Sequence, residues 1–160
     1  MRTMKVETAA PIIFSIVLVI SIVLNMLSPR VEIVDRDFVK ANIGTPGVVV
    51  VDTRSEEVFD GKSPVPGIPG GHIDGAINFP LDDLNISAVV AALAKAGLTK
   101  SNTIILYCTD GHSSARFGEA LVSQFGYDPL RVKSYRGGVV DWIQDPYNKL
   151  YPEDHETGWN

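Results

Sequence analysis

Residues 103–121, TIILYCTDGHSSARFGEAL, contain a strand, a short polar loop and the start of a helix in direct succession. The apolar run Thr103–Tyr107 is typical of a buried strand, because three branched apolar residues stand together and turn residues follow at once. The strand leads into Cys108, the only cysteine of the chain. A helix is predicted from about Ser114, with Gly126 as its end.

This arrangement predicts an anion nest around the cysteine sulfur. Successive loop N–H groups and the positive end of the helix would point toward Cys108 and keep it as a thiolate at neutral pH. The residues that would line the nest are Thr109, Asp110, Gly111, His112, Ser113 and Ser114. The alternative is that Cys108 is only a small buried hydrophobic residue, as lone cysteines at strand ends usually are.

Composition excludes several other classes of function. The net charge is −5 and the pI is about 5.1, which argues against a nucleic-acid partner. A single cysteine excludes an internal disulfide and a cysteine-clustered zinc site, and three scattered histidines do not suggest a metal. We therefore expect no metal.

The N-terminal region predicts a membrane anchor. Residues 10–27 carry no charge over roughly the length that a bilayer-spanning helix needs. A cleaved signal peptide fits less well, because a small-residue cleavage site is poorly matched, and a buried core helix would need a polar face. The expected organisation is an anchor at 1–29, a domain at 30–146 and a loose acidic tail at 147–160. Basic residues flank the apolar run on both sides, so their distribution does not fix its orientation. A short N-terminal tail followed by a long globular part usually behaves as a signal anchor, and we therefore expect the domain to lie outside the cytoplasm.

Strands and helices are expected to alternate along the domain. The predicted strands are Val31–Ile33, Val48–Asp52, a short one within Gly71–Pro80, the cysteine strand and Leu130–Ser134. The predicted helices are Arg36–Asn42 (capped by Asp35), one beginning near Ser55, Asn85–Ala96, the helix after the cysteine loop and Val139–Ile143. This alternation indicates a parallel α/β sheet that binds ligands at the carboxyl ends of its strands. Asp52, Arg54, Cys108 and Arg136 all follow strand ends, so they are expected to meet at that edge.

Four short motifs resemble the rhodanese (sulfurtransferase) domain family. They are VDTR at Val51–Arg54, GHIDGAIN at Gly71–Asn78, YCTDGHSS at Tyr107–Ser114 and YRGGVVDW at Tyr135–Trp142. They follow the family's order, and the resemblance spans roughly Val31 to Trp142, nearly all of the chain outside the predicted anchor. The resemblance implies a single-domain, rhodanese-like, doubly wound parallel sheet, here preceded by one transmembrane helix.

The resemblance also implies a reaction and a site. Sulfane sulfur would pass from thiosulfate or a persulfide donor to Cys108, and from there to a thiol or cyanide, in two covalent steps that require no metal or organic cofactor. The donor and the acceptor could be small molecules or proteins. The loop residues named above, together with Arg54 and Arg136, would bind the substrate. Family phosphatases place an arginine six positions after the cysteine, where this chain has Ser114, so phosphatase activity is not expected.

The loop departs from the family in its charge. Many thiosulfate-using relatives carry a cation there, but Thr109 and Asp110 occupy the first two positions. A carboxylate about 6 Å from thiosulfate would cost about 3 kcal/mol per unit charge of the donor at an effective dielectric of about 20. The groups that could offset this cost are Arg54, Arg116, Arg136 and a protonated His112. Otherwise a persulfide donor is favoured over thiosulfate.

Other residues of the motifs are expected to be structural, and a second function stays open. Asp52 is expected in an ion pair, His72 in a backbone hydrogen bond and Trp142 in the core, while Arg54 fits bracing and pocket lining equally well. Gly61–Gly70 fits a solvated loop, although a lid is possible. The alternative to an enzyme is a rhodanese-like interaction or sensor module with a membrane-protein partner, which a short tether would keep close.

Overall fold

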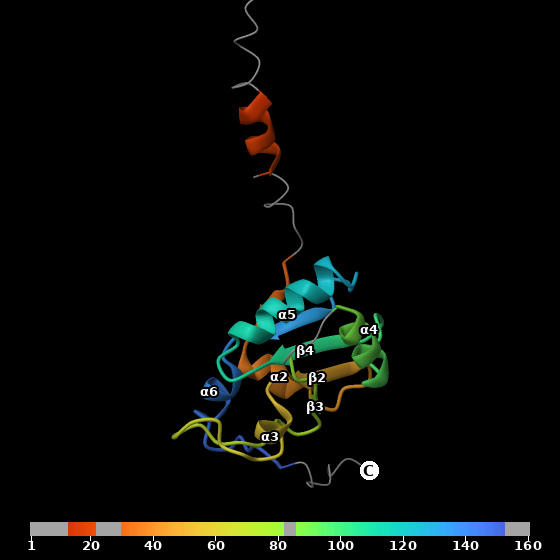
Figure 1. Ribbon diagram of the computed structural model, residues 1–160. Coiled ribbons are helices and arrows are strands. Elements are labelled where there is room, and N and C mark those ends of the chain that lie inside the picture. The colour runs from red at the N-terminus through yellow and green to blue at the C-terminus, as the bar shows by residue number, and fades with distance from the viewer. Residues whose placement is uncertain (1–12, 22–29, 82–85, 153–160) are drawn as a thin grey trace, which may run out of the picture. The chain divides into compact units, whose positions relative to one another are not determined.

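The computed structural model describes residues 13–21, 30–81 and 86–152, with side-chain burial left undescribed at 86 and 87 (Figure 1). It divides into two units, Met1–Arg30 and Val31–Asn160. In the first unit, residues 13–21 form a helix with exposed side chains, and the rest of the predicted anchor lies outside the described residues. None of the described helices has both the length and the apolar character that crossing a bilayer requires.

The second unit is built on a five-stranded sheet, and all of its pairings are parallel. The spatial order is β1–β5–β4–β2–β3. The strands are β1 (Glu32–Val34), β2 (Val48–Asp52), β3 (Ile77–Asn78), β4 (Thr103–Tyr107) and β5 (Val132–Tyr135). The two central strands have the bounds predicted from their apolar runs. The parallel α/β sheet predicted from the sequence is therefore confirmed.

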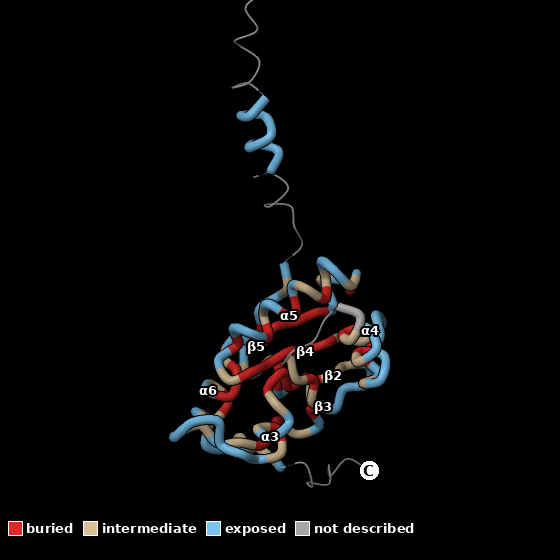
Figure 2. The backbone as a smooth tube through the Cα atoms, viewed as in Figure 1, coloured by how far each residue is buried: buried red, intermediate tan, exposed pale blue. Residues whose placement is uncertain are grey.

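Helices cover both faces of this sheet (Figure 1). They are α2 (Arg36–Asn42), α3 (Glu56–Phe59), α4 (Ile86–Lys95), α5 (His112–Ser123) and α6 (Gly138–Trp142). Side chains alternate along the strands, so Ile105 and Tyr107 of β4 pack in one core and Ile104 and Leu106 in the other. The central strands are buried along most of their length, as Figure 2 shows, and their near-continuous apolar sequences follow from cover on both sides.

Two predictions about chain segments need correction. The helix α5 begins at His112, two residues before the predicted start, because Gly111 adopts a positive φ of +84° and turns the loop directly into the helix. The tail after Pro146 was predicted to be loose, but its first part packs on the domain. Tyr151 forms an antiparallel bridge with His72, and the Trp142 indole N–H donates to the carbonyl of Lys149 at 3.0 Å. Residues 153–160 lie outside the described part.

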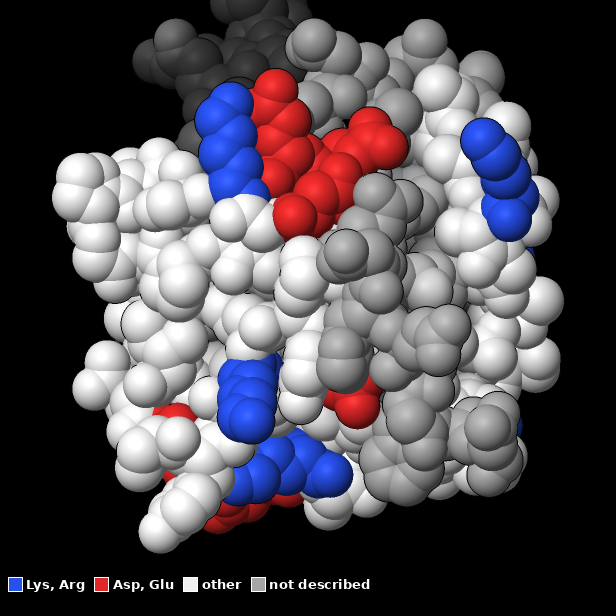
Figure 3. Space-filling model, turned by 90° about the horizontal axis from the view of Figure 1, so that it is seen from below, with Lys and Arg blue, Asp and Glu red and all other residues white. Residues whose placement is uncertain are grey.

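Several bracing roles predicted from the sequence are confirmed. Asp35 caps α2 by accepting from the Phe38 N–H at 2.9 Å. Nδ1 of His72 lies 3.1 Å from the carbonyl oxygen of Phe59, and the His72 ring stacks on the Phe59 ring with the two ring centres 3.7 Å apart. Trp142 is buried in the core. On the face that Figure 3 shows, basic and acidic side chains lie near one another and form no continuous basic surface among the residues drawn in colour.

Candidate active site

The cysteine loop lies between the end of β4 and the start of α5, at the carboxyl edge of the sheet. Cys108 is only 3 % exposed. The Gly111 N–H donates to Cys108 Sγ at 3.1 Å. The cysteine is thus buried, and its sulfur is surrounded in part by main-chain and hydroxyl donors.

The loop is held in this shape by the first turn of α6. The Val139 and Val140 N–H groups donate to the carbonyls of Cys108 and Thr109, at 3.0 Å each. The two carbonyls thus accept hydrogen bonds from N–H groups at the start of α6, which have no partner within the helix itself. These two bonds fix the backbone of the loop in which the Gly111 N–H faces the sulfur.

Two glycines permit this close approach of segments distant in sequence. A Cβ on Gly111 would lie 2.1 Å from the carbonyl oxygen of Arg136, and a Cβ on Gly138 would lie 2.5 Å from that of Cys108. Both glycines have positive φ, +84° and +56°. The cysteine loop and the turn before α6 therefore interlock through backbone contacts alone.

The surroundings of Cys108 favour its thiolate. Burial by itself raises the pKa of the thiol, but hydrogen bonds from Ser113 and Ser114 and from the Asp110 main chain lower it by more, so the net pKa is below its ordinary 9.0. A thiolate is the nucleophilic form of cysteine. The anion nest predicted from the sequence is consistent with this geometry.

Asp110 places an acidic group next to the sulfur. Its Oδ1 lies 3.7 Å from Cys108 Sγ and accepts from the His112 N–H at 3.1 Å. That backbone hydrogen bond is the main reason why the pKa of Asp110 lies below its usual value. The His112 ring stands 3.3 Å from Asp110 Oδ2, and both side chains are largely exposed. An ionised carboxylate therefore stands beside the exposed side of the cysteine loop.

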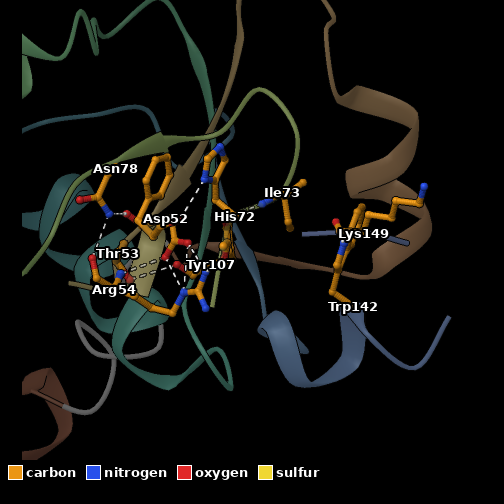
Figure 4. Close-up of polar contacts among 11 residues, drawn as sticks. Asp52, Thr53, Arg54, His72, Ile73, Asn78, Tyr107, Trp142 and Lys149 are labelled. Carbon is orange, nitrogen blue, oxygen red and sulfur yellow. Dashed lines mark hydrogen bonds and ion pairs between the residues drawn. The ribbon is translucent and has the colours of Figure 1, made fainter. Parts of the chain in front are cut away.

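Arg54 lies at the same edge of the sheet but is held inside a buried ion pair (Figure 4). Its Nε donates to Asp52 Oδ1 at 2.9 Å, and its Nη2 donates to Asp52 Oδ2 and to the carbonyl of Gly71. Burial lowers the pKa of Arg54, but the Asp52 carboxylate raises it by more. Of the two roles left open for Arg54, the geometry favours bracing; substrate binding stays a prediction.

The ion pair stands beside a buried tyrosine that sequence reasoning did not single out. The Tyr107 hydroxyl accepts the Ile73 N–H at 3.0 Å, and burial raises the pKa of Tyr107 well above its usual value. Asn78 donates to the carbonyl of Arg54 at 2.9 Å. The first contact joins the end of β4 to the segment before β3, and the second joins the end of β3 to the residues after β2.

The remaining predicted site residues differ in how far they face solvent. Ser114 is fully buried, and its hydroxyl donates to the carbonyl of Gly111 at 3.2 Å. Ser113 is exposed and Thr109 is half-buried. The side chain of Arg136 is exposed, and its main-chain carbonyl lies against Gly111. Sequence reasoning missed Val139, Val140 and Gly138, whose contribution is through the backbone; the paired glycines Gly137-Gly138 were their only signal.

Comparison with known proteins gives the family and relatives of this chain. The family described as rhodanese-like domain matches residues 35–145. A thiosulfate sulfurtransferase of Azotobacter vinelandii is 30% identical over 119 residues, which cover 69% of this chain and 42% of that relative. The chain thus spans less than half the length of this relative.

Solved structures share the fold at lower identity. The anaerobic ergothioneine biosynthesis enzyme from Chlorobium limicola, in complex with trimethyl histidine, superimposes with a TM-score of 0.69 at 20% identity, covering 78% of this chain and 28% of that one. The wild-type structure of EanB gives 0.68 at 20% identity, with the same two coverages.

Proposed function

The chain belongs to the rhodanese-like domain family, and from that premise we propose that it is a sulfurtransferase that carries sulfane sulfur on Cys108. The observation that carries the proposal is the Cys108 sulfur held under the Gly111 N–H, with its pKa lowered by the loop's hydrogen bonds. The thiosulfate sulfurtransferase of Azotobacter vinelandii supports the reaction type.

The proposed reaction has two half-reactions with balanced charges. In the first, the Cys108 thiolate attacks the outer sulfur of the donor. With thiosulfate, the new Sγ–S bond replaces the donor's S–S bond and sulfite leaves with the electron pair. In the second half-reaction, the persulfide anion takes up a proton from water and an acceptor thiolate attacks its outer sulfur. The electron pair of the broken Sγ–S bond returns to Sγ as a thiolate, and the proton leaves on the acceptor persulfide. Storing the sulfur covalently divides one difficult transfer into two easier ones.

The loop provides what both half-reactions need. The N–H groups of Gly111 and Ser114 and the hydroxyl of Ser113 stabilise negative charge on Sγ, which is the attacking group in the first step and the leaving group in the second. Fixed donors of this kind stabilise developing charge without reorganising. Thr109 and His112 lie at the exposed rim where a donor would enter.

Incubating the full chain with a sulfane donor tests this proposal. We expect the intact mass of the wild type to rise by one sulfur atom and to return to its first value when a thiol is added. Cys108→Ser, which removes the only cysteine, should show no gain. A folded wild type that gains no sulfur from thiosulfate, from an organic persulfide or from a polysulfide would contradict the proposal and favour a binding module with a membrane partner.

The proposal includes a membrane tether and an extracytoplasmic site. Its support is the uncharged stretch of residues 10–27, whose length matches a bilayer-spanning helix. A tethered domain would meet donors and acceptors at the membrane surface at raised effective concentration.

A further inference from the structure

A cavity of about 480 Å³ lies beside the cysteine loop, against α5. Four residues of α5 that line it share one helical stripe, at spacings of three and four: Ser113, Arg116, Phe117 and Ala120. Leu81, Val89 and Phe125 complete the apolar part of its lining, and Gln124 adds a polar side chain. The volume lies in the range of pockets that bind small molecules.

The cavity is joined to the reactive sulfur through Ser113. This residue hydrogen-bonds Cys108 and also lines the cavity. Arg116 follows one helical turn later, about 4.5 Å further along the axis at 1.5 Å per residue. A molecule lying in the cavity would therefore have one end near the Cys108 loop and its body along α5.

The lining combines apolar walls with one cation. Phe117 and Val89 are buried core residues, and Phe117 stacks on Phe79 at 5.2 Å. The Arg116 side chain is exposed and makes no hydrogen bond or ion pair with any residue that the structure describes. Such a lining complements a molecule with an apolar chain and an anionic group.

We propose that this cavity binds the acceptor: a small thiol with an apolar chain that ends in a carboxylate. The inference rests on the proposed sulfurtransferase function and identifies its substrate class. Arg116 would bind the carboxylate, and the apolar walls would bind the chain. The thiolate would then attack the outer sulfur of the Cys108 persulfide, giving the acceptor persulfide and the Cys108 thiolate.

The experiment uses the full chain loaded with persulfide, and it follows loss of the added sulfur by mass in single turnovers. The acceptors are 3-mercaptopropionate, 6-mercaptohexanoate and the uncharged 6-mercaptohexanol. For the wild type we expect 6-mercaptohexanoate to react about fivefold faster than 6-mercaptohexanol, as a partly exposed ion pair allows. We expect 6-mercaptohexanoate to react about eightfold faster than 3-mercaptopropionate, because it has three more methylene groups and half-burial of each contributes about twofold.

Two variants and one control separate these contributions. Arg116→Gln should bring the carboxylate-to-alcohol rate ratio close to one. Ala120→Leu, which narrows the cavity, should reduce the effect of chain length. The matched control is Arg131→Gln, because this substitution removes an equal charge at the opposite edge of the sheet, where Arg131 donates a hydrogen bond to the carbonyl of Ser101. This control should keep both ratios.

The possible results distinguish this inference from the proposed function. A wild type that loads persulfide but shows no preference for the carboxylate, or a preference that survives Arg116→Gln, would overturn the acceptor subsite alone. Failure to load persulfide at all would overturn the proposed function and the subsite with it.

Discussion

Gly111→Ala is expected to reduce the rate of persulfide formation about a hundredfold or more, the scale of losing one preorganised donor to a developing charge. A methyl group at this position would lie 2.1 Å from the carbonyl oxygen of Arg136. The loop would have to move away from the turn before α6, which displaces the N–H group that bonds Cys108 Sγ. Alanine is also strained at the φ of +84°.

Gly75→Ala is the matched control. Gly75 has a positive φ of +69°, but a Cβ there would meet nothing within 4 Å. This variant should lose about 1 kcal/mol of unfolding free energy from the backbone conformation and keep the rate of persulfide formation. Persulfide formation at the wild-type rate in a folded Gly111→Ala, measured by intact mass, would contradict the interlocked loop.

Asp110→Asn is expected to raise kcat/KM for thiosulfate about thirtyfold. The sequence suggested a cost of about 3 kcal/mol per charge of the donor, but the Asp110 side chain is 61% exposed, so solvent screens it. About 1 kcal/mol per charge then remains, or about 2 kcal/mol for a dianion. Asparagine keeps an oxygen that can accept the His112 N–H, so the loop should stay in place.

An uncharged donor and a distant carboxylate provide the controls for this prediction. An uncharged organic polysulfide should react with Asp110→Asn at nearly the wild-type rate, because the carboxylate does not repel it. Asp128→Asn removes an equal charge at the turn before β5 and should leave the thiosulfate rate unchanged. If Asp110→Asn used thiosulfate no better than the wild type, the electrostatic account of donor choice would be wrong.

The sheet could be predicted from the sequence because its signals are local. The continuous β-branched run of β2 and the apolar run of β4 mark strands that are covered on both faces, and their bounds agree with the prediction. Asp35 indicated the start of α2, because aspartate is a preferred residue at the N-cap of a helix. The cysteine loop was also visible, since a strand, a small-residue loop and a helix follow one another directly.

The contacts that shape the site could not be predicted in the same way, because they join segments far apart in the chain. The α6 N–H groups bond the Cys108 loop over about thirty residues of sequence, and the Tyr107 hydroxyl bonds Ile73 across another thirty-four. Main-chain donors leave no side-chain signature. The guanidinium of Arg54 also donates to the carbonyl of Gly71, which is seventeen residues further along the chain. The sequence does not show that these two residues meet, so it left the role of Arg54 open.

The most direct test of the account is the pKa of Cys108, read from thiolate ultraviolet absorbance as pH is raised. The chain has one cysteine, so the difference between the wild type and Cys108→Ser reports that sulfur alone, however deeply it is buried. The account predicts a midpoint below 9.0, because the loop's hydrogen bonds outweigh the effect of burial. A midpoint at or above 9.0 would show that the loop does not stabilise the thiolate, and would contradict the proposed chemistry.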